Sequence, residues 1–91
     1  MRKQHNYTNE PDLLLKLSKG DEEAYTHIYN QYHADVLKLA QKFATSPQQA
    51  QDLTLGVFAK IWVNRQELPD ITSLVDYLFV TAYDYILSET R

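Results

Sequence analysis

Cysteine is absent from this 91-residue chain, and glycine, proline and long apolar runs are scarce. Without a thiol there is no disulfide framework, no thiolate metal site and no cysteine nucleophile, so a reducing compartment, the cytoplasm, is the expected location. Two glycines are too few for a glycine-rich phosphate-binding loop. Eighteen consecutive apolar residues occur nowhere, and no signal-peptide-like apolar run follows the N-terminus, so we expect neither membrane insertion nor export.

Candidate catalytic and metal-ligating residues are also few. His27 and His33 are six residues apart, which places them about 240° apart around a helix, so they cannot chelate one ion. Serine, histidine and aspartate all occur, but none stands in a nucleophile-elbow sequence. We therefore expect no enzymatic activity, no bound metal and no cofactor.

Charge is distributed unevenly along the chain, although the formal net charge is only −3. Residues 36–66 contain four basic side chains and one acidic one, whereas residues 67–91 contain five acidic side chains and one basic one. Lys38 and Lys42 are one helical turn apart, and both a solvated face and a ridge that contacts phosphates fit this spacing. Only the middle third of the chain is expected to attract nucleic-acid phosphates.

What the chain does contain is helical periodicity. Apolar residues recur at three- and four-residue steps in three long segments, which predicts amphipathic helices of roughly 20, 18 and 16 residues. Their predicted N-terminal caps are Asp21, Ser46 and Ser73. After Ser46, Pro47 fits the first helical position, and Gln49 is expected to reach back to the amide of the cap in a capping box.

A shorter helix is predicted from Pro11 to Leu17, with Asn9 as its cap and Gly20 as its stop signal. Sustained period-two alternation and hairpin turns are missing. The expected fold class is therefore all-α, a compact bundle of three long helices with the short N-terminal helix laid across them. Residues 1–10 are expected to form a flexible tail, and residues 11–91 a single domain.

Aromatic side chains are numerous and could stack on unpaired bases, but most fall on the predicted inner stripes. Tyr83 lies off the stripe of the last helix, and we expect it to be exposed. The six aromatic residues expected in the core are Tyr25, Tyr29, Tyr32, Trp62, Tyr77 and Tyr85.

Gly56 interrupts the predicted helix that runs from the Ser46 cap to about Arg65, at a position where alanine would be more stable by about 1 kcal/mol. Two explanations stay open. The glycine could let another backbone approach, with Leu55 as an exposed apolar anchor, or it could be a replacement that packing tolerates. Gly56→Ala is expected to stabilise the isolated domain by several tenths of a kcal/mol or more and, if the glycine serves docking, to weaken docking.

Three segments carry a specific combination of residues: GDEEAY at 20–25, SPQQAQDL at 46–53 and VFAKIWVNRQELPDI at 57–71. In this order they resemble the second conserved region of bacterial extracytoplasmic-function sigma factors, and most of all its Bacteroidetes-type members. The resemblance covers about residues 12–79. It implies a sigma-factor region-two-like helical domain that takes part in transcription initiation and performs no chemistry itself.

The resemblance also implies partners. The third predicted helix would dock on the coiled coil of the largest subunit of core RNA polymerase, while the loop from 64 to 73 and the last helix would bind the melted −10 element of the promoter as single-stranded DNA. An anti-sigma factor would be a further partner. The polymerase-binding residues would be Asp52, Leu55, Gly56 and Ala59. The DNA-binding residues would be Lys60, Asn64, Arg65, Gln66 and Tyr83.

A second function stays open because the chain departs from the family at several of these positions. Thr54, Leu55 and Gly56 stand where the family usually has a valine, a glutamine and an acidic residue, and Tyr83 and Asp84 replace basic and amide residues. The alternative is a sigma-like helical module without DNA binding, which binds another protein or forms a weak homodimer through the surface around Leu55. Only a promoter-binding domain would bind single-stranded DNA with a steep dependence on salt.

Overall fold

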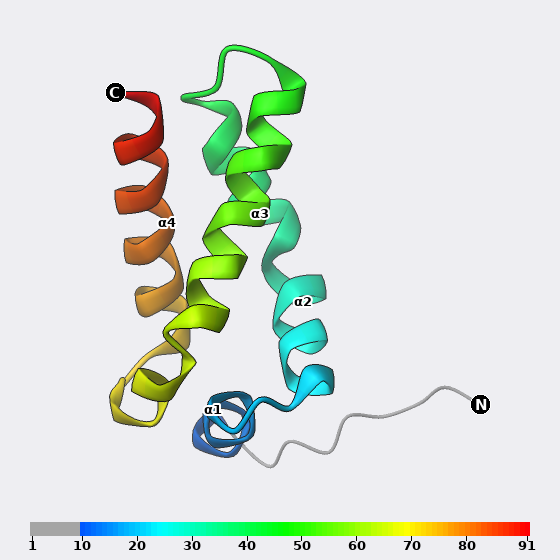
Figure 1. The fold of residues 1–91 in the computed structure, drawn as a ribbon, viewed down its shortest axis with the longest axis vertical. Helices are drawn as coiled ribbons and strands as arrows, with labels where there is room; N and C mark the ends of the chain where they lie inside the picture. The colour runs from blue at the N-terminus through cyan, green and yellow to red at the C-terminus, as the bar shows by residue number, and fades with distance from the viewer. Residues whose placement is uncertain (1–9) are drawn as a thin grey trace, which may run out of the picture.

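The computed structural model describes residues 10–91, and every regular element in this range is a helix. The elements are α1 (Glu10–Ser18), α2 (Glu22–Gln41), α3 (Pro47–Val63), the 3₁₀ helix η1 (Arg65–Asp70) and α4 (Leu74–Thr90), as Figure 1 shows. The all-α class is confirmed, and the three long helices have 20, 17 and 17 residues. The expected tail over residues 1–9 and the cap at Asn9 lie outside the described residues.

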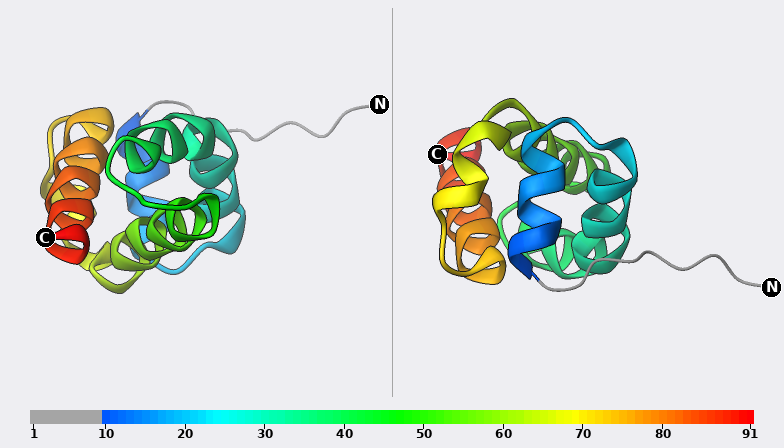
Figure 2. Two further views of the ribbon diagram at one scale, coloured as in Figure 1. Left: turned by 90° about the horizontal axis from the view of Figure 1, so that it is seen from above. Right: turned by 90° about the horizontal axis from the view of Figure 1, so that it is seen from below.

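The three long helices form the body of the fold, and α3 packs against both α2 and α4 (Figure 1). The short helix α1 lies across one end of this body, where α2 begins and α3 ends (Figure 2). It packs against η1 and α2. This arrangement leaves one side of α3 without a neighbouring helix, and it leaves α2 and α4 less closely packed with each other than either is with α3.

The core is formed by the predicted apolar stripes. Each fully buried Leu, Ile or Phe side chain contributes about 1.5–3 kcal/mol relative to an exposed one, so these stripes supply the main stabilisation. The six aromatic residues expected in the core are half-buried and pack against its fully buried side chains. The largest fully buried apolar side chains are Leu17, Ile28, Val36, Val57, Phe58, Ile61, Leu68, Leu74, Leu78 and Ile86.

All three predicted caps are confirmed. The Asp21 carboxylate accepts hydrogen bonds from the amides of Glu23 and Ala24 at 2.9 and 3.3 Å. The Ser46 hydroxyl accepts from the Gln49 amide at 3.1 Å, and the Ser73 hydroxyl accepts from the Asp76 amide at 3.2 Å. Each bond satisfies a donor that the first helical turn leaves without a partner.

The capping box at α3 differs from the prediction in one residue. The Gln49 side-chain oxygen accepts from the Thr45 amide at 2.6 Å and from the Thr45 hydroxyl at 3.1 Å, not from the Ser46 amide. Thr45 offers two donors side by side, whereas the amide of the cap offers one. The glutamine therefore ties down the residue before the cap.

The break between α1 and α2 is a complete Schellman motif. Gly20 has a φ of 87°, a left-handed conformation that favours glycine. Its amide donates to the Leu17 carbonyl at 2.9 Å, and the Asp21 amide donates to the Lys16 carbonyl at 3.1 Å. Asp21 thus closes one helix with its backbone and caps the next with its side chain.

The connection between α3 and α4 is more ordered than the sequence indicates. We expected α3 to end near Arg65 and a loop to follow, but α3 ends at Val63, and Arg65–Asp70 forms a 3₁₀ helix that contains Pro69. Leu68 on this helix is fully buried. One buried leucine thus anchors the connection to the core.

Glu10, which we expected to belong to the tail, begins α1 and joins it to α4. One oxygen of its carboxylate accepts a hydrogen bond of 2.7 Å from the backbone amide of Leu74. This amide lies in the first turn of α4, where the helix dipole favours a negative charge. The contact joins residues 64 positions apart and fixes where α4 begins.

Candidate partner-binding surfaces

The outer side of α3 is open to solvent. We define the α3 flank as Asp52, Leu55, Ala59 and Val63, which follow one another at three- and four-residue steps along the helix. All four are exposed, Leu55 to 56% and Val63 to 73%. The flank is thus a short apolar strip with one carboxylate at its N-terminal end.

A hollow adjoins the C-terminal half of the α3 flank, between α3 and the first turns of α2. Its volume is about 470 Å³, and Ala59 and Val63 form part of its wall. Tyr25 and Trp62 form another part, with their rings edge to face and their centroids 5.1 Å apart. An apolar side chain of a partner could therefore enter a preformed aromatic-walled site next to the flank.

The three residues at 54–56 point in three different directions. Thr54 is fully buried, and its hydroxyl donates to the Ala50 carbonyl at 2.9 Å. Leu55 points outward. Gly56 faces α4, where the Tyr85 ring covers it. Of these three positions, only Leu55 belongs to the open side of α3.

Gly56 therefore has an explanation within the fold: packing against Tyr85 outweighs helix propensity, in agreement with the second of the two explanations from the sequence. A Cβ added at Gly56 would lie 2.5 Å from Cζ and 2.6 Å from Cε2 of Tyr85, and closer still to the hydroxyl oxygen. Such distances require the tyrosine to move. This contact opposes the gain in stability expected from Gly56→Ala, and the approach of a partner's backbone is not needed to explain the glycine.

Arg65, one of the expected DNA-binding residues, is folded back onto the end of α3. Its guanidinium lies 4.4 Å from the centroid of the Trp62 ring, and Nη1 donates to the Trp62 carbonyl at 2.9 Å. Its Nε is buried and has no hydrogen-bond partner. A cation at this position stabilises the C-terminal end of the helix, and one hydrogen-bond donor of the guanidinium is already engaged within the fold.

The other expected DNA-binding residues are not brought together. Lys60 lies in a hollow between α3 and α4 with two carboxylates, those of Asp84 and Glu89. Tyr83 faces α2 instead, with its ring 5.9 Å from that of Phe43. Gln66 is exposed on η1 and Asn64 is half-buried. The predicted exposure of Tyr83 is confirmed at 48%, but a continuous basic surface is not formed by these residues.

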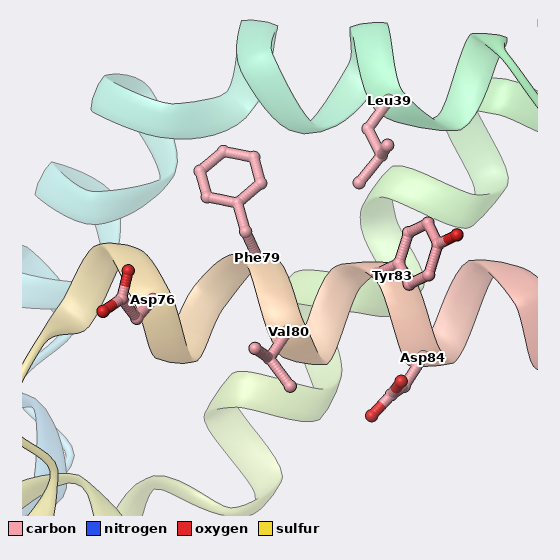
Figure 3. A pocket seen from close by; sticks show the side chains of 6 residues that line it. All are labelled: Leu39, Asp76, Phe79, Val80, Tyr83 and Asp84. Carbon is pink, nitrogen blue, oxygen red and sulfur yellow. The ribbon is translucent and has the colours of Figure 1, made fainter.

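The sequence reasoning missed a groove between α2 and α4. It is shallow, with a volume of about 720 Å³, and Figure 3 shows the six side chains that line it. Val80 is 62% exposed at its edge. The signal was the pair of outward apolar residues on the last helix, of which only Tyr83 was recognised. We define the α2/α4 groove by its lining residues Leu39, Asp76, Phe79, Val80, Tyr83 and Asp84.

Three half-buried tyrosines, Tyr25, Tyr32 and Tyr77, form a set that we call the core-edge tyrosines. Burial is the main cause that raises the pKa of each above its ordinary value. The neighbouring Tyr29 raises the pKa of Tyr25 further, and nearby carboxylates raise those of Tyr32 and Tyr77. A hydrogen bond with Thr81 partly opposes the shift in the pKa of Tyr77. All three phenols therefore stay neutral well above physiological pH.

Comparisons of the chain with models of known protein families, with curated proteins and with solved structures gave no match. Within residues 10–91, no helix has both the length and the apolar character that crossing a membrane requires.

Proposed function

We propose that this domain is a sigma-factor-like module that docks on core RNA polymerase through the α3 flank. The observation that carries the proposal is the exposure of Leu55 and Ala59 on a helix whose opposite face is fully committed to the core. The sequence between Asp52 and Trp62 resembles the sigma-factor segment that serves this purpose, except at positions 54–56, where it departs from the usual residues of the family. In this segment the buried side chains lie on one face of α3 and the exposed ones on the other, so a partner could contact the exposed face without disturbing the core.

The size and shape of the α3 flank suit a helical partner. From Asp52 to Val63 the flank extends about 17 Å along the helix axis, which is about three turns. Ala59 is small, so a helix of a coiled coil could approach to the usual interaxial distance of about 8–10 Å. Leu55 on one side and the hollow beside Trp62 on the other would then supply a projecting side chain and a receiving site.

Binding of the melted promoter strand is the second part of the proposal, with Lys60, Asn64 and Gln66 as the contacting residues. Such binding needs cations along the phosphates and aromatic faces for the bases. Fluorescence anisotropy with a labelled single-stranded A/T-rich oligonucleotide tests it. We expect the affinity to fall steeply as salt rises, and Lys60→Gln to reduce the salt dependence by about one phosphate contact.

One observation favours the alternative, a protein-interaction module without DNA binding. Together η1 and α4 contain five acidic side chains and one basic one, Arg65, so this side of the domain disfavours phosphates. If the oligonucleotide does not bind at any salt concentration while polymerase binding persists, the domain binds protein without binding DNA, as the alternative states.

Polymerase docking is tested by titrating a fluorescently labelled domain with purified core polymerase. Leu55→Asp places a charge in the proposed contact, and we expect it to weaken binding by about tenfold or more. Val80→Asp is the matched control, because Val80 is exposed to a similar extent, 62% against 56%, but lies on α4. Equal loss in both variants, or unchanged binding of Leu55→Asp, would contradict the proposal.

A further inference from the structure

We propose that the α2/α4 groove is a docking site for a basic amphipathic helix of another protein. The groove is formed by α2 and α4 and does not include the α3 flank, so this inference stands apart from polymerase docking. In Figure 3, Leu39 from α2 and Phe79 and Tyr83 from α4 line the space between the two helices. In this view Val80 and the carboxylate of Asp84 extend from the side of α4 that is turned away from α2, whereas Asp76 lies over the first turn of α4.

Leu39 and Phe79 pack partly against the core, but closing the bundle does not use all of the groove's apolar surface. Leu78, Ala82 and Ile86 are fully buried and already supply the contact of α4 with the core. Val80 and Tyr83 remain 62% and 48% exposed. Single exposed apolar residues are normal on a protein surface, but here they are contiguous with a hollow of about 720 Å³, which is typical of an interaction site.

The hollow continues along α4 towards η1. A second depression, of about 380 Å³, shares Asp76 and Val80 with the groove and adds Asp70 and Ile71. Apolar and acidic side chains thus alternate along one side of α4 and the turn before it. The strip therefore covers at least about two turns of α4.

The charge of the groove identifies the kind of occupant. Among the described residues, both charged side chains that line it are acidic, those of Asp76 and Asp84. Lys38 and Lys42 are exposed on α2 but do not line the groove. Phosphate backbones and anionic membrane surfaces are repelled by such a site, whereas Lys or Arg side chains are attracted.

The spacing of the two carboxylates indicates how far apart the basic residues of a partner helix would lie. Asp76 and Asp84 are eight residues apart, which corresponds to about 12 Å along the helix axis. A second helix laid along the groove would meet them with basic residues about two turns apart. Between these, apolar residues at three- and four-residue steps would contact Phe79, Val80 and Tyr83.

Two synthetic peptides test the inference. One is an amphipathic helical peptide of about four turns, with leucines on one face and lysines on its flanks, and its twin carries glutamates in place of the lysines. Binding of each to the full chain is measured by fluorescence anisotropy and mapped by amide chemical shifts. We expect the lysine peptide to bind, the glutamate twin not to bind, and the shifts to cluster on the facing sides of α2 and α4.

Variants make the test specific. Asp76→Asn combined with Asp84→Asn should weaken the lysine peptide about fivefold, and Val80→Ser should do so by a similar factor. Leu55→Ser is the matched control, because it shortens an apolar side chain of similar exposure on α3, and it should leave the affinity within about twofold. Circular dichroism of each variant checks that the bundle is intact.

Three results would overturn the inference. The first is an absence of binding by the lysine peptide. The second is binding that maps to the α3 flank or is insensitive to the groove variants. The third is a single-stranded oligonucleotide that shifts the amides around Phe79 and Tyr83, which would assign the groove to nucleic acid.

Discussion

Replacing Gly56 with alanine has two opposing effects on stability: a gain in helix propensity and a clash with Tyr85. On an isolated helix, alanine is more favourable than glycine by about 1 kcal/mol. In this fold the new methyl group would lie 2.5 Å from Cζ of Tyr85, well inside van der Waals contact. The tyrosine must leave its position, and overpacking of this kind destabilises a protein by about 1–3 kcal/mol. We therefore expect Gly56→Ala to lower the free energy of unfolding by about 1 kcal/mol.

A second substitution reverses the expected sign. Tyr85→Leu removes the ring atoms that approach Gly56 and leaves a shorter apolar side chain in place. In this background Gly56→Ala should raise the free energy of unfolding by about 0.5–1 kcal/mol, since only the helix propensity remains. The coupling between the two positions would then be about 1.5–2 kcal/mol, which lies within the range of about 0.5–3 kcal/mol found for residues in contact.

Urea unfolding of the four proteins, followed by far-ultraviolet circular dichroism, measures this cycle. The slope of the unfolding free energy with urea should be unchanged, so that midpoints report stability directly. The reasoning is refuted if Gly56→Ala stabilises both backgrounds by the same amount. Such additivity would mean that Tyr85 does not occupy the space next to the glycine.

Three further predictions concern the packing of α1, the end of α3 and the core-edge tyrosines. Glu10→Gln keeps the hydrogen bond to Leu74 but removes its charge, so urea unfolding should show a loss of about 0.5–1 kcal/mol. A loss below the error of the measurement would contradict a contribution of the charge at this position. Arg65→Gln should lower the free energy of unfolding by about 1–2 kcal/mol, because it removes both the contact with the Trp62 ring and the hydrogen bond to the Trp62 carbonyl. Lys60→Gln, at an exposed position, is the control and should be nearly neutral. The pKa values of the core-edge tyrosines are raised in the folded state. Their contribution to stability is therefore complete below the unfolded-state pKa of about 10. It is lost as the pH rises through the higher pKa values of the folded state. Parallel urea unfolding and ultraviolet titration of tyrosinate check this, and a decline that begins well below pH 10 would speak against it.

The helix boundaries could be predicted because the signals are local. Asp21, Ser46 and Ser73 each form their capping bond within three residues of their own position, so the sequence contains both partners of each bond. Gly20 likewise ends α1 through its own backbone conformation. The 3₁₀ helix η1 was missed because its formation depends on the burial of Leu68 against the rest of the fold rather than on a local pattern.

The candidate site was predictable only in part. Leu55 falls off the apolar stripe of its helix, so its exposure follows from periodicity alone. The covering of Gly56 by Tyr85 joins residues on two helices, and the sequence does not state which way α4 presents its tyrosines to α3. Arg65 was expected to face DNA because its cationic group is visible in the sequence, whereas its contact with Trp62 is not.

Site-specific photocrosslinking tests the central claim, that the open side of α3 is where the domain meets core polymerase. A photoreactive amino acid is placed at position 59 in the middle of the α3 flank and, as a comparison, at position 80 on α4, both of which are exposed. The account predicts a crosslink from position 59 to the largest polymerase subunit and none, or far less, from position 80. Equal crosslinking from both positions, or none from position 59 under conditions where position 80 reacts, would contradict it.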